Sequence, residues 1–112
     1  MEESSEPAMP ANRTSALEMI LSQNPADSLA RYGLAMERIK AGEFEEAVRE
    51  FTVLLEAKPD YLYAYFHAGQ TLEKLSRSAD ARRMYTLGIE AAVRKGDSHA
   101  QSELQTALDL LG

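Results

Sequence analysis

The sequence predicts an all-α protein, built as an antiparallel array of six helices. Apolar residues recur at helical spacing along most of the chain. Proline and glycine interrupt this pattern at short intervals, and no pair of alternating segments flanks a hairpin turn. At 112 residues the chain has the usual length of one domain. We therefore expect a single helical domain over residues 12–112.

The first eleven residues, MEESSEPAMPA, are acidic and rich in serine and proline. Because they carry too little apolar surface to offset the entropy of ordering, residues 1–11 are predicted to form a disordered acidic tail. They lack the basic start and apolar run of a secretion signal. No apolar stretch of the chain has the length of a membrane span. These features predict a cytoplasmic protein.

Two helices are expected before residue 42. The first covers residues 12–25, where Asn24-Pro25 ends the apolar pattern. Asp27 or Ser28 can then accept hydrogen bonds as the N-cap of a second helix, and Gly42 suits its C-terminal stop. The apolar face of that second helix contains Leu29, Tyr32, Met36 and Ile39.

The third and fourth helices meet at Pro59, which cannot continue a helix. The third covers residues 43–58, with glutamates near its positive N-terminal end. The stretch YLYAYFHAG, residues 61–69, alternates tyrosines as a strand would. Because it runs on to Leu75 without a turn signal, we predict a helix there.

The fifth helix is expected over residues 78–95, ending at Gly96. Ser98 and Gln101 have the spacing of a capping box, which predicts the start of a sixth helix there. That final helix, residues 98–110, has an apolar stripe that includes Leu104, Ala107 and Leu108.

The chain also aligns with itself after a shift of about 34 residues. Pro25 then falls on Pro59, Ala47 falls on Ala81, and Phe51 falls on the equivalent Tyr85. A fixed period of helix–turn–helix units indicates a stacked array, in which each unit buries its apolar face on the next.

In this period the chain resembles the tetratricopeptide repeat (TPR) family. The residues that carry the resemblance are Leu34, Ala47, Phe51 and Pro59 in residues 28–61, and Tyr65, Gly69, Ala81 and Tyr85 in residues 62–95. The resemblance implies a right-handed superhelix of about 2.5 repeats: a half repeat at 12–25, the two full repeats, and a capping helix at 98–110. Arg31 and Arg38 depart from the family pattern, since they replace its two early aromatic residues.

Small residues at matching repeat positions predict close contacts between helices. Ala47, Ala81 and Gly69 would let helix backbones approach, while Phe51 and Tyr85 fill the neighbouring space.

No motif for catalysis, phosphate binding or metal binding is present, and cysteine is absent. His67 and His99 stand on different expected helices, so a structural or exposed role is favoured for each. The net charge of −6 argues against nucleic acid and anionic membranes as partners. We predict a protein that is not an enzyme and that needs no cofactor or metal.

The TPR resemblance implies a concave face, lined by the first helix of each pair, that commonly binds peptides or protein segments. Here the implied partner-binding residues are Leu29, Tyr32, Met36, Ile39, Lys40, Tyr63, Phe66, Gln70, Glu73 and Lys74, with His99, Ser102 and Thr106 as a continuation. Tyr63 and Phe66 exceed what a two-layer stack needs for its core, and exposed aromatic patches usually mark interaction sites.

These features predict a protein–protein interaction module that binds a partner segment in an apolar and aromatic groove. The alternative is a structural homodimer that uses the same groove.

Overall fold

The computed structural model describes residues 9–112 and contains six α-helices in that range. It has no strand among these residues, so the predicted all-α fold is confirmed. The helices are α1 (Met9–Gln23), α2 (Ser28–Lys40), α3 (Phe44–Ala57), α4 (Leu62–Lys74), α5 (Ser78–Lys95) and α6 (Ser98–Leu111).

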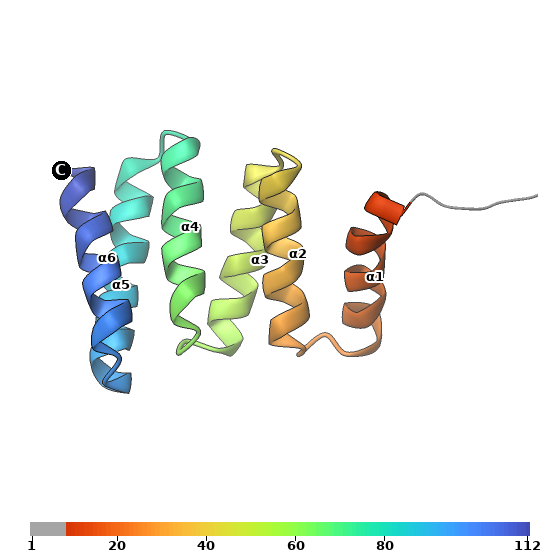
Figure 1. Cartoon of the computed structure of the whole chain (residues 1–112), viewed down its shortest axis with the longest axis horizontal. Helices are drawn as coiled ribbons and strands as arrows, with labels where there is room; N and C mark the ends of the chain where they lie inside the picture. The colour runs from red at the N-terminus through yellow and green to blue at the C-terminus, as the bar shows by residue number, and fades with distance from the viewer. Residues whose placement is uncertain (1–8) are drawn as a thin grey trace, which may run out of the picture.

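The helices stand side by side and alternate in direction, as Figure 1 shows. The array of helices measures 55 × 28 × 20 Å, which is the elongated shape of an open repeat structure. Each helix packs against its neighbours in sequence, and α4 also contacts α6. Because one antiparallel helix separates them, α4 and α6 run in the same direction.

Helix α1 begins at Met9 and so includes the last three residues of the predicted tail. Pro10 in its first turn is compatible with a helix there, because the first backbone N–H groups of a helix have no internal partner. Residues 1–8, the remainder of that tail, lie outside the described range.

The helix ends follow the turn chemistry of the sequence, with one correction. Asp27 caps α2 by accepting a hydrogen bond from the Ala30 amide at 2.9 Å. Gly42 and Gly96 adopt left-handed φ angles of 77° and 72° after α2 and α5. The expected capping box of α6 is wrong by one residue.

The cap of α6 is Asp97, which accepts from the Ala100 amide at 2.9 Å, while Ser98 is the first helical residue. Since Gly96 already ends α5, Asp97 directly after it is placed to cap the next helix.

The core of the second full repeat depends on glycines that face bulky rings. A Cβ atom built on Gly69 would lie 2.3 Å from Cε1 of Tyr85, whose side chain is fully buried. A Cβ on Gly88 would lie 2.7 Å from Cβ of Tyr65. The predicted closeness at Gly69 is therefore confirmed, and Gly88 is a second close approach that the sequence analysis missed.

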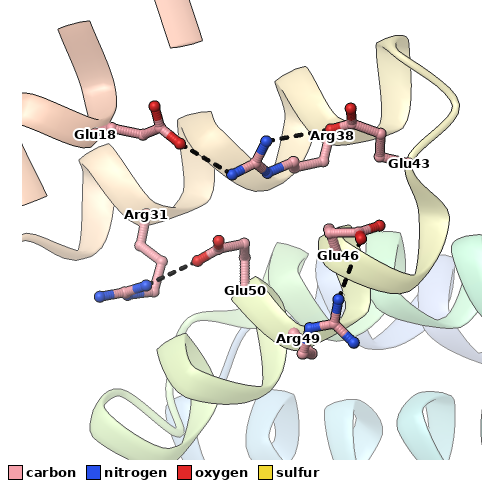
Figure 2. A network of polar contacts seen from close by, with 7 residues as sticks. All are labelled: Glu18, Arg31, Arg38, Glu43, Glu46, Arg49 and Glu50. Atoms are coloured by element: carbon pink, nitrogen blue, oxygen red, sulfur yellow. Dashed lines mark hydrogen bonds and ion pairs between the residues drawn. The ribbon is translucent and has the colours of Figure 1, made fainter. Parts of the chain in front are cut away.

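Ion pairs connect the first three helices, as Figure 2 shows. Arg31 on α2 pairs with Glu50 on α3 at 2.7 Å. Arg38 bridges Glu18 on α1, at 3.1 Å, and Glu43 before α3, at 3.2 Å. These two arginines stand where the TPR pattern has aromatic residues, so charge pairing takes the place of apolar packing at these two positions.

Candidate protein-binding surface

A groove with a volume of about 430 Å³ lies between the parallel helices α4 and α6. Its lining combines apolar, hydroxyl and carboxylate side chains, with α5 forming part of the floor. The lining residues are Phe66, Gln70 and Glu73 from α4, Tyr85 from α5, and His99, Ser102, Glu103, Thr106, Ala107 and Leu110 from α6.

The floor of this α4–α6 groove is aromatic. The ring centroids of Phe66 and Tyr85 are 6.4 Å apart. The Tyr85 hydroxyl donates a hydrogen bond to the carboxylate of Glu73. Burial, together with that carboxylate, raises the pKa of Tyr85 well above its usual value, which keeps the phenol protonated as a donor. The Glu73 side chain is thereby fixed at the edge of the groove.

The rim of the groove is accessible and carries a second carboxylate. Leu110 is 83% exposed, and Tyr63 is 40% exposed. Partial burial and the nearby carboxylates of Glu103 and Asp97 raise the pKa of the Tyr63 phenol. The Nε2 atom of His99 lies 3.4 Å from a Glu103 oxygen. An exposed leucine and polar groups therefore line a hollow large enough to take a side chain, and Tyr63 lies beside it near Glu103.

A second hollow, of about 460 Å³, lies between α1 and α2. Leu29, Tyr32 and Met36 contribute to it from α2, and Leu17 and Ile20 contribute from α1. Leu29 is strongly exposed. Three of the predicted partner-binding residues thus meet here, separated from those of the α4–α6 groove.

Aromatic rings of α2, of α4 and of the turn before α4 pack against one another between these two hollows. The Tyr32 ring lies 5.2 Å from that of Tyr61, which belongs to the turn before α4, and 5.9 Å from the ring of His67. Burial and the neighbouring tyrosines raise the pKa of Tyr32, and burial lowers the pKa of His67. Met36 and Ile39 pack partly buried against the same cluster. Where the sequence predicted one continuous face, the structure therefore has two hollows, separated by packed aromatic rings.

The remaining predicted residues lie near the ends of this surface. Lys40 is exposed, with its Nζ atom 3.4 Å from Glu37. Lys74 shares a small hollow with Gln70 and Glu73 at the far end of α4. His99, Ser102 and Thr106, expected to continue the face, all line the α4–α6 groove.

The groove residues that the sequence analysis missed are Tyr85, Glu103, Ala107 and Leu110. The three on α6 follow the i, i+4, i+7 spacing of one helix face, so extending the face from His99 would have found them.

Within residues 9–112 no three side chains of the metal-ligating types come together. No helix in the same range combines the length with the hydropathy of a membrane span.

Comparison with known proteins shows the family of the chain. No family model matches it. A TPR repeat-containing protein of Pseudomonas aeruginosa is 27% identical over 92 residues, which are 82% of this chain and 88% of that protein. The solution structure of a tetratricopeptide repeat domain protein from Salinibacter ruber is 39% identical, with a TM-score of 0.74 over 79% of this chain and 89% of the other.

More distant structures share the fold alone. PcrH, in complex with the chaperone binding region of PopD, has a TM-score of 0.84 at 14% identity, over 91% of this chain and 77% of the other. The relationship to the Salinibacter protein extends over most of both chains, and the six-helix array has the helix–turn–helix repeat that the sequence period predicts. The chain belongs to the tetratricopeptide repeat family.

Proposed function

We propose that this protein is a non-catalytic interaction module that binds a segment of a partner protein in the α4–α6 groove. The observation that carries the proposal is the groove itself, a hollow of about 430 Å³ with an aromatic floor at Phe66 and an exposed apolar rim at Leu110. A hollow that combines an aromatic floor, apolar rim atoms and a few polar groups has the composition of a binding site.

The fold supports this reading. The structural neighbours include PcrH bound to the chaperone binding region of PopD, and SycD, a type III secretion translocator chaperone of Yersinia enterocolitica with a TM-score of 0.82. These proteins share the architecture at 14% and 16% identity, so they support a helical array as a scaffold for binding a protein segment. The cytoplasmic location expected from the sequence stays a prediction.

The experiment is a selection of peptides on the immobilised chain from a random displayed library, followed by fluorescence anisotropy with the best peptide. Thr106→Trp introduces a large side chain at an exposed position of the groove, and Phe66→Ala removes part of the floor. We expect each to weaken binding about 10-fold or more, the size of a hot-spot contact.

Leu87→Ala is the matched control, because Leu87 is a partly exposed apolar residue in the hollow between α3 and α5. Binding that responds to Leu87→Ala and ignores Thr106→Trp would refute the groove assignment. Phe66 packs partly against the core, so circular dichroism should first confirm that Phe66→Ala is folded.

Self-association through the same groove is the alternative outcome of this test. Light scattering over a dilution series would show a dimer that Thr106→Trp dissociates. That result would make a second copy of the chain the occupant, in place of a partner segment.

A further inference from the structure

We infer that the α4–α6 groove selects a basic segment, in which lysine or arginine residues flank an apolar side chain. The inference rests on the proposed function and names the chemistry of its partner. The lining of the groove contains two carboxylates, Glu73 and Glu103, and neither lysine nor arginine. The one lining side chain that can become cationic is His99, which is strongly exposed and lies 3.4 Å from Glu103.

The two carboxylates are placed to receive cations at different levels of the groove. Glu103 lies near Tyr63, which stands in the first turn of α4. Glu73 lies ten residues beyond Tyr63 along α4, so the two carboxylates stand at different levels of the groove. A short segment can therefore place one basic residue at each carboxylate and an apolar side chain over Phe66 between them.

The Glu73 carboxylate is oriented by a hydrogen bond and can still accept others. Its carboxylate accepts a hydrogen bond from Tyr85, a fully buried and neutral donor, and it forms no ion pair among the residues of the described range. A carboxylate accepts several hydrogen bonds, so capacity for a cationic donor remains. Lys74 is adjacent at the end of the helix, in the small hollow that it shares with Gln70 and Glu73.

Long-range charge acts in the same direction. The net charge of −6 attracts cationic segments and speeds their encounter with the surface, while the groove carboxylates set where they dock. An acidic segment would place unpaired charges against Glu73 and Glu103. The charge of the groove therefore discriminates between partners as well as attracting one.

The test uses the peptides selected on the full chain at neutral pH, and single glutamines in place of the groove carboxylates. Glu73→Gln removes the charge and keeps an oxygen that can accept from Tyr85. We expect the selected peptides to be enriched in lysine or arginine beside an apolar residue. We expect Glu73→Gln and Glu103→Gln each to weaken binding about 2- to 5-fold, the range of an exposed ion pair.

Glu56→Gln is the matched control, because it removes the same charge from the hollow between α3 and α5. Glu56→Gln should leave the affinity unchanged. Added salt should weaken the wild type more than Glu73→Gln.

Two further outcomes separate this inference from the proposed function. Peptides that Thr106→Trp blocks, yet that lack basic residues and bind both glutamine variants as well as the wild type, would overturn the basic-segment inference alone. Selected peptides whose binding is indifferent to Thr106→Trp would overturn both.

Discussion

Replacing Gly69 with alanine tests the close approach of α4 and α5 that holds the groove together. The added Cβ would lie 2.3, 2.6 and 2.8 Å from three atoms of the Tyr85 ring. That ring is fully buried and its hydroxyl is bonded to Glu73, so it cannot turn aside freely. Overpacking of this kind costs about 1–3 kcal/mol.

The higher helix propensity of alanine relative to glycine offsets at most about 1 kcal/mol of this destabilisation. We expect Gly69→Ala to be destabilised by about 1–2 kcal/mol, which lowers Tm by roughly 4–9 °C for a domain of this size. Urea unfolding followed by circular dichroism measures the free energy of unfolding directly.

Gly33→Ala is the matched control within α2. Its Cβ would lie 3.4 Å from the Leu17 side chain, an ordinary contact, so we expect equal or slightly higher stability. In a double-mutant cycle, Tyr85→Leu should relieve at least part of the cost of Gly69→Ala. Gly69→Ala as stable as the wild type would refute the packing described for α4 and α5.

Three further predictions concern a cap, an ion pair and a buried histidine. Asp97→Ala should lower the free energy of unfolding by about 1 kcal/mol, whereas Ser98→Ala should change it little; equal effects would contradict the cap. Arg31→Ala leaves the half-buried Glu50 unpaired and should lower the free energy of unfolding in urea by about 1–3 kcal/mol. An unchanged free energy would show that the pair does not stabilise the fold. Because burial lowers the pKa of His67, the unfolded chain binds more protons below about pH 6.5, so stability falls as the pH drops through that value towards the folded pKa. His67→Gln should reduce this loss of Tm between neutral and mildly acidic pH, and an unchanged pH profile would contradict it.

The helices and their ends could be predicted from the sequence because their causes are local. The proline at residue 59 and the glycines at 42 and 96 act within a few residues of where they stand. The repeat period extended this local information to one long-range pair, since Gly69 and Tyr85 occupy positions that the TPR pattern associates with close packing.

The separation of the predicted binding residues into two hollows could not be predicted in the same way. The Tyr61 ring packs on the Tyr32 ring, at a centroid distance of 5.2 Å, and no spacing rule relates these two residues. The contact between Tyr85 and Glu73 likewise joins different helices. Periodicity assigns a residue to a face of its own helix, whereas these contacts depend on how the helices are placed against one another.

The sequence shows that Arg31 and Arg38 replace aromatic residues of the TPR pattern. It does not show which carboxylates pair with them. Their partners Glu50, Glu18 and Glu43 lie on other elements, between 5 and 20 residues away along the chain. The chain offers several alternative carboxylates at similar separations, so the pairing follows from the fold.

The most direct test of the central claim, that the α4–α6 groove is the binding surface, is a nuclear magnetic resonance titration of the isotope-labelled chain with the tightest selected peptide. We predict that the largest amide shift changes fall between residues 63 and 73 of α4 and between 99 and 110 of α6, and that α3 stays nearly unperturbed. Largest changes in α3 and on the side of α5 that carries Leu87 would contradict the account.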